Sequence, residues 1–177
     1  YVFKPINTVV NAFYYHSLLL MKQIAEVLGK TADAQQFQQD AGRVYQSFQS
    51  VFFNTATGLY VDGEGTTHSS LHANMFPLAF GLVPKDKQPA VINFVKSKQM
   101  ACSVYGAQYL LEGLYRSGQQ EAALALMTSD STRSWVNMMR EGSTITMEAW
   151  GIAYKPNQDW NHAWGAAPGN IITRYLM

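Results

Sequence analysis

Hydrophobic residues recur at helical spacing in the first part of the chain. Between Asn7 and Leu28 they return every three or four positions, and Gly29 follows as a residue type that commonly ends helices. A second stripe with the same spacing starts after Thr31, which can cap a helix, and continues to Val51. Because the joint between the two stripes is so short, the sequence predicts an antiparallel helical hairpin.

The rest of the chain repeats this plan of helix, glycine joint and helix. Residues 53–70 are rich in Gly, Thr and Asn and predict a loop with a short extended piece near Leu59. Helical patterns then follow at residues 70–81, 86–98, 104–117 and 119–127, and a last one opens at Trp164. The predicted class is all-α, with antiparallel helical hairpins side by side, for which a toroidal array buries both helix faces.

Composition narrows this picture mainly by exclusion. The chain has 177 residues, of which 47% are hydrophobic, as is typical of a single folded domain with a sizeable core. Thirteen Lys and Arg against twelve Asp and Glu give a net charge of +1, and the basic residues form no run. We therefore expect neither nucleic acid nor a membrane as a partner.

The single cysteine and the chain ends add three expectations. Cys102 has no second cysteine with which to form a disulfide or a zinc site. The chain starts at Tyr1 rather than Met and stops inside an apolar pattern, so we read it as a piece cut from a longer chain. The compartment stays open, although a periplasmic or secreted location would suit a full-length protein that has lost a signal peptide.

All four tryptophans fall between residues 135 and 164, in a window that is otherwise rich in irregular backbone. Trp150, Trp160 and Trp164 lie in sequence near the carboxylates of Glu148 and Asp159. Sugar hydrolysis needs carboxylates to move protons, and flat apolar faces suit sugar rings. The window therefore indicates a carbohydrate site, with chance clustering in a core as the alternative.

Glu148 is the only Asp, Glu, His, Lys or Arg between residues 142 and 154. A charge with few polar neighbours is costly unless it is paired, which makes Glu148 a candidate for chemistry; the alternative is a solvated loop glutamate. His162 can hydrogen-bond a sugar hydroxyl; the alternative is that it caps the last helix or satisfies a carbonyl in the core. For Asp159, a helix cap is the favoured interpretation.

A metal or cofactor site has weak support in the sequence. His68 and His72 lie four positions apart, which suits one face of a helix, but no third ligand is evident. A structural role for this pair is favoured. We therefore expect neither a metal nor a cofactor.

The segment GSTITMEAWGIAYKPNQDWNHAWGAAPGNIITRYL resembles the end of the helical-barrel catalytic domain of α-L-rhamnosidases of glycoside hydrolase family 78. The segments NAFYYHSLLLMKQIAEVLGK, GLYVDG, HANMFPLAFGLVP and SVYGAQYLLEGLY are also similar. The resemblance implies an (α/α)6 barrel and an inverting hydrolase that releases α-L-rhamnose from glycosides or polysaccharides. It also implies that Glu148 is the general base and His162 a sugar-contacting residue.

The sequence departs from this family in two places. The acidic motif that carries the family's general acid does not occur in residues 1–177, so we expect about the second half of a barrel that is inactive alone. Gly151 stands where family members often carry an Asp. With half of the barrel missing, we expect an open apolar face through which the chain can self-associate.

Two other functions stay open from the residues alone. A polysaccharide lyase with a helical toroid would need cations near the site, and Arg133, Arg140 and Lys155 are the nearest in sequence. A noncatalytic sugar-binding or scaffold module is the other. In either hydrolase or module, we expect Glu148, Trp150 and His162 to converge on a concave face at the loop ends, outside the packed core.

Overall fold

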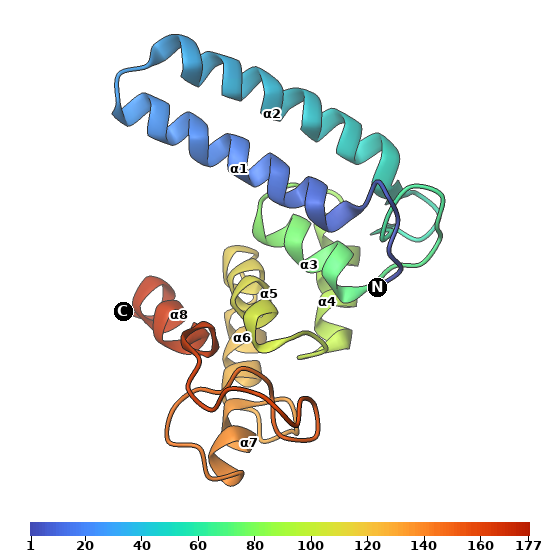
Figure 1. Ribbon diagram of the computed structural model, residues 1–177. Coiled ribbons are helices and arrows are strands. Elements are labelled where there is room, and N and C mark those ends of the chain that lie inside the picture. The colour runs from blue at the N-terminus through green and yellow to red at the C-terminus, as the bar shows by residue number, and fades with distance from the viewer. The chain divides into compact units, whose positions relative to one another are not determined.

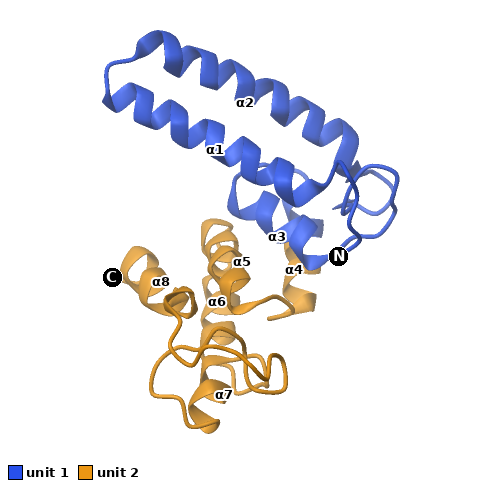
Figure 2. Ribbon diagram, in the orientation of Figure 1, with its two compact units in different colours: residues 1–91 blue, residues 92–177 orange.

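The computed structural model describes residues 1–177 and has the all-α character that the sequence predicts. The chain forms two compact units, residues 1–91 and residues 92–177, which Figure 2 colours separately. The only strands are β1 (Phe53–Asn54) and β2 (Leu59–Tyr60), which form a short antiparallel ribbon. The helices labelled in Figure 1 are α1 (Thr8–Val27), α2 (Thr31–Phe52), α3 (Leu71–Ala79), α4 (Gln88–Lys98), α5 (Val104–Arg116), α6 (Gln120–Met127), α7 (Trp135–Arg140) and α8 (Ala167–Tyr175).

In the first unit, α1 and α2 form the predicted antiparallel hairpin (Figure 1). Gly29 lies in the joint with a φ of +67°, a left-handed conformation that glycine adopts without strain. α1 begins after Asn7, whose side chain accepts a hydrogen bond from the backbone N of Val10. The predicted cap at Thr31 is wrong, because Thr31 is the first helical residue and Lys30 holds the N-cap position without a side-chain hydrogen bond.

The hydrophobic stripe that predicts α1 is largely exposed. The buried positions of this helix include Ala12, Leu18 and Ala25, so small side chains form much of the contact with α2. Larger apolar side chains that share the other side of the helix are exposed, and we call them the α1 apolar face: Val10, Tyr14, Met21, Ile24 and Leu28. A correct helical period therefore identified the helix but not the side that packs.

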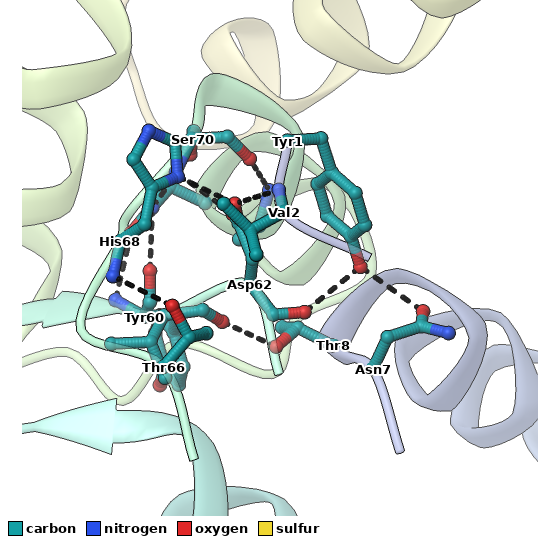
Figure 3. Close-up of polar contacts among 12 residues, drawn as sticks. Tyr1, Val2, Asn7, Thr8, Tyr60, Asp62, Thr66, His68 and Ser70 are labelled. Carbon is teal, nitrogen blue, oxygen red and sulfur yellow. Dashed lines mark hydrogen bonds and ion pairs between the residues drawn. The ribbon is translucent and has the colours of Figure 1, made fainter. Parts of the chain in front are cut away.

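A buried carboxylate organises the polar part of the first unit (Figure 3). The Asp62 side chain is fully buried and accepts hydrogen bonds from the backbone N of Val2 at 2.6 Å and of Ser70 at 2.9 Å. It also contacts the Nδ1 of His68 at 2.6 Å. The Asp62 backbone O accepts from the backbone N of Thr8 at 3.0 Å. Asp62 thus ties the N-terminal segment to the start of α3 through its carboxylate, and to the start of α1 through its backbone O.

His68 and His72 do not face a common site. His68 turns toward Asp62, whereas the His72 ring contacts the rings of Tyr1 and Phe76, with centroids 6.4 and 6.2 Å apart. Burial lowers the pKa of His72. The structure gathers no group of three or more His, Cys, Asp or Glu side chains placed to hold a metal ion.

In the second unit, α5 is the central helix. It contacts α6, α8 and the 3-10 turn η1 (Ala163–Gly165). Gly118 joins α5 to α6 with a φ of +73°, so the predicted hairpin is confirmed. The core of this unit includes Leu110, Leu111 and Leu114 from α5 and Ile171 from α8. Nothing in the sequence pattern predicted α7, which has only six residues.

No helix combines the length and the apolar character needed to cross a bilayer.

Candidate active site

Two irregular segments of the second unit are joined by hydrogen bonds and place the candidate site just before η1 and α8. The backbone N of His162 donates to the O of Thr146 at 2.8 Å, and the Thr146 hydroxyl donates to the O of His162 at 2.9 Å. Further along, the backbone N of Glu148 donates to the O of Asp159 at 3.0 Å. Pairing between residues 146–148 and 159–162 therefore fixes Glu148 and His162 relative to each other.

The Glu148 carboxylate is paired and partly accessible. Lys155 Nζ lies 2.5 Å from its Oε1, and the backbone N of Asp159 donates to its Oε2 at 3.1 Å. The side chain keeps 16% of its surface exposed. The hydrogen bond from Lys155, followed by that from Asp159, lowers the pKa of Glu148, so the group is a carboxylate at neutral pH. The charge that looks isolated in sequence thus has a partner seven positions later.

His162 and Trp164 form a stacked pair beside this carboxylate. Their ring centroids are 4.0 Å apart with an interplanar angle of 18°. Trp164 Nε1 donates to the backbone O of Glu148 at 3.3 Å, and the indole is 41% exposed. His162 Nδ1 is buried without a hydrogen-bond partner. The pair therefore places a partly exposed aromatic surface next to Glu148.

Two more exposed aromatic residues belong to this region. Trp160 is 42% exposed and lies directly after Asp159. Tyr105, in the first turn of α5, has its ring centroid 5.5 Å from that of Trp164 and its hydroxyl 3.2 Å from that of Tyr109. Tyr105 was not among the residues that the sequence singled out, because its only signal there is a pair of tyrosines one helical turn apart.

Trp150 does not lie with these residues, and the prediction that it lines an open face is wrong. Only 2% of its surface is exposed. Its Nε1 donates to the backbone O of Cys102 at 2.7 Å, and its ring packs edge-on against Trp135 at a centroid distance of 5.0 Å. A large indole with its one donor satisfied is stable in a core, and Trp150 is part of that core.

The two capping interpretations are also wrong. η1 begins after His162 without a side-chain cap, and α8 has Ala166 at its N-cap position. Asp159 contributes its backbone N and O to Glu148, not a cap to a helix. Both residues therefore form hydrogen bonds with the segment that contains Glu148.

A lyase would need cations near its site, and the three that are nearest in sequence each contact another group of this chain. Lys155 is paired with Glu148. Arg140 donates to the backbone O of Asp130 at 2.6 Å, and the Arg133 guanidinium lies 5.2 Å from the centre of the Tyr154 ring. Chemically, the arrangement offers an ionised carboxylate that can accept a proton, next to exposed aromatic rings.

Comparison with known proteins gives consistent matches. The chain is 25% identical to an alpha-L-rhamnosidase of Streptomyces avermitilis over 146 residues, which are 82% of this chain and 14% of that protein. It is 26% identical to an alpha-L-rhamnosidase of Formosa agariphila over 156 residues, covering 85% and 16% of the two chains. The chain thus spans 14% to 16% of the length of these relatives.

A solved structure shows the same fold. The rhamnosidase from Klebsiella oxytoca with rhamnose bound matches with a TM-score of 0.81 at 15% identity, over 96% of this chain and 34% of that one. In addition, residues 2–176 match the model of the bacterial alpha-L-rhamnosidase 6 hairpin glycosidase domain. Its helical hairpins agree with α1 and α2 and with α5 and α6. The chain therefore belongs to the family of bacterial alpha-L-rhamnosidase six-hairpin glycosidase domains.

Proposed function

We propose that the full-length protein is an inverting α-L-rhamnosidase in which Glu148 is the general base. The observation that carries this proposal is the ionised, partly exposed Glu148 carboxylate beside the stacked rings of His162 and Trp164. Family membership and the rhamnosidase names of the relatives support rhamnose as the sugar that is released. The substrate is then a rhamnose-containing glycoside or polysaccharide.

In this reaction Glu148 polarises a water molecule on the ring face opposite the leaving group. The water oxygen attacks the anomeric carbon, the glycosidic C–O bond breaks, and the water proton passes to the Glu148 carboxylate. A carboxylic acid about 6.5 to 9.5 Å away protonates the leaving oxygen. We propose that this acid lies outside residues 1–177, so the chain alone does not hydrolyse glycosides.

The aromatic residues bind and orient the sugar. The exposed indoles of Trp164 and Trp160 offer apolar faces to a sugar ring. His162 is held flat against Trp164 with its Nδ1 buried, so we propose that its Nε2 hydrogen-bonds a sugar hydroxyl. Trp150 has no such role because it lies in the core.

Replacing Glu148 with Gln in the full-length protein tests the proposal. The variant keeps the shape of the side chain but cannot accept a proton, so kcat on an aryl α-L-rhamnoside should fall at least about a hundredfold with little change in KM. Glu121→Gln on exposed α6 is the matched control and should keep full activity. Retained turnover in Glu148→Gln would rule out Glu148 as the base. Absence of activity in the unsubstituted full-length protein would favour a noncatalytic sugar-binding module.

A further inference from the structure

A second carboxylate, Glu141, fastens the backbone that follows Glu148. Its Oε2 accepts a hydrogen bond from the backbone N of Ile152 at 2.7 Å, and its Oε1 accepts one from Asn137 Nδ2 at 3.2 Å. The same Asn137 amide donates to the backbone O of Trp150 at 2.8 Å. Glu141 and Asn137, at the end and on the first turn of α7, therefore hold the chain on both sides of Gly151.

Gly151 is the residue that lets this carboxylate approach. A Cβ at position 151 would stand 2.3 Å from Glu141 Oε1 and 2.9 Å from Asn137 Nδ2, closer than a real Cβ approaches other atoms. All of these atoms belong to the ends of side chains, so a Cβ at position 151 would displace the Glu141 carboxylate and the Asn137 amide. The absence of a side chain at this position and the position of the Glu141 carboxylate depend on each other.

Gly151 also starts the turn that carries Lys155. The backbone O of Gly151 accepts hydrogen bonds from the N of Tyr154 at 3.0 Å and from the N of Lys155 at 3.4 Å. Lys155 Nζ then lies 2.5 Å from Glu148 Oε1. Glu141 therefore holds Ile152, the neighbour of Gly151 in the chain, and Gly151 in turn bonds to Lys155, which pairs with Glu148.

We infer that Glu141 is a positioning residue: together with Asn137 it holds the Gly151 turn so that Lys155 stays against the Glu148 carboxylate. The inference rests on the proposed role of Glu148 as general base. The ionisable side chains that act on Glu148 are those of Lys155 and His162, and Asp159 acts through its backbone N. Of these residues, Lys155 is the one whose backbone N donates to the O of Gly151.

A double-mutant cycle in the full-length protein tests this chain of contacts. Glu141→Ala removes the carboxylate, and Gly151→Ala places a Cβ where the carboxylate lies. Each should lower kcat on an aryl α-L-rhamnoside by about tenfold to a hundredfold, the scale expected for a misplaced catalytic group. Because both changes break the same contact, the double variant should be no slower than the slower single variant.

The pH profile separates positioning from a general loss of structure. Since Lys155 lowers the pKa of Glu148, losing its position should move the acidic limb of kcat/KM to higher pH in all three variants. Glu141→Gln keeps one oxygen that can accept from Ile152, so it should retain more activity than Glu141→Ala. Glu121→Ala on exposed α6 should change neither kcat nor the pH profile.

The outcomes distinguish this inference from the proposed function. The role of Glu141 alone would be overturned by the following combination. Glu148→Gln loses activity, but the losses in Glu141→Ala and Gly151→Ala multiply in the double variant and the acidic limb of kcat/KM does not move. Full activity in Glu148→Gln would overturn the base instead. Hydrogen exchange gives a readout without activity: the Ile152 amide should exchange faster in Glu141→Ala, and unchanged exchange there would also overturn the inference.

Discussion

Lys155 is the residue that sets how the proposed base responds to pH. Its ammonium group lies 2.5 Å from Glu148 Oε1 and is the largest cause of the lowered pKa of that carboxylate. A base is active when it is deprotonated, so the lowered pKa keeps Glu148 active at more acidic pH. Lysine at this position therefore extends the working range of the site toward acid.

Replacing Lys155 with Met should narrow that range. Without the ammonium group the pKa of Glu148 rises, so activity should be lost at a higher pH as the solution is acidified. The measurement is kcat/KM on an aryl α-L-rhamnoside against pH in the full-length protein. Lys30→Met, at the exposed joint of α1 and α2, should leave the profile unchanged. An acidic limb at the same pH in Lys155→Met would show that the contact does not tune the base.

How far single residues could be predicted depends on whether their signal lies in the local sequence. The motif around Glu148 and His162 located the segment, and its hydrogen-bonded pairing brings both residues together. The Lys155 contact was missed because a turn, not a periodic element, brings it back to Glu148. Trp150 was misplaced because adjacency to a carboxylate does not reveal which way an indole points.

At the scale of elements, Asp62 holds the N-terminal segment and the start of α3 through its carboxylate, and α1 through its backbone O (Figure 3). Burial alone would raise its pKa, but the hydrogen bonds from Ser70, Val2 and His68 outweigh burial and lower it. A carboxylate with a lowered pKa stabilises the fold above its unfolded pKa, and this stability is lost as pH falls through the folded pKa.

Asp62→Asn should destabilise the first unit near neutral pH. The amide keeps one acceptor oxygen, but its NH2 group replaces the other oxygen and faces groups that are themselves donors. The loss should therefore be about 2 to 3 kcal/mol in the free energy of unfolding. Denaturant unfolding of the full-length protein at pH 7, followed by hydrogen exchange in residues 1–91, measures it. The difference from the unsubstituted protein should begin to shrink below about pH 4, where Asp62 is protonated in the unfolded chain, and should be lost as the pH falls through the lower pKa of Asp62 in the folded protein. A loss that stays constant down to low pH would show that the charge of Asp62 is not its source.

The periodicity of apolar residues predicts the long helices, but neither the short helix α7 nor the side on which a helix packs. It predicted α1 and α2 because long stripes at three- and four-residue spacing fit the period of a helix and not that of a strand, whereas the joint at Gly118 marked the pair α5 and α6. It missed α7, because six residues give too short a pattern. It also could not tell that the α1 apolar face is exposed, since packing depends on neighbouring elements and not on the helix itself.

That exposed face leads to a prediction for residues 1–177 expressed alone. Four large apolar side chains on one side of α1, together with Leu28 at its end, form a surface that water solvates poorly, so the chain should self-associate through it. Met21→Lys combined with Ile24→Lys should shift the chain toward monomer in sedimentation velocity. Gln35→Lys combined with Gln38→Lys, at exposed positions of α2, adds the same charge as a control. A purely monomeric unsubstituted chain at high concentration would contradict the prediction.

At the scale of the whole molecule, we propose that residues 1–177 provide one of the two carboxyl groups that inversion needs, Glu148. The chain covers 14% to 16% of its rhamnosidase relatives, and the expectation that an upstream half of the barrel completes it stays a prediction. The two roles can be separated chemically. A base activates the nucleophile, whereas an acid assists the leaving group, so an activated leaving group and an added nucleophile bypass them independently.

Glu148→Gly with added azide uses this separation in the full-length protein. Removing the side chain opens space on the face where the water attacks, and azide needs no base because it is already an anion. Turnover of a dinitrophenyl α-L-rhamnoside should be low in the variant and rise with azide concentration, and NMR should identify the product as the β-rhamnosyl azide. Glu121→Gly should form no azide product, because water still occupies its intact site. An α-configured azide would mean that the nucleophile enters from the side of the leaving group, so Glu148 could not be the base of an inverting enzyme.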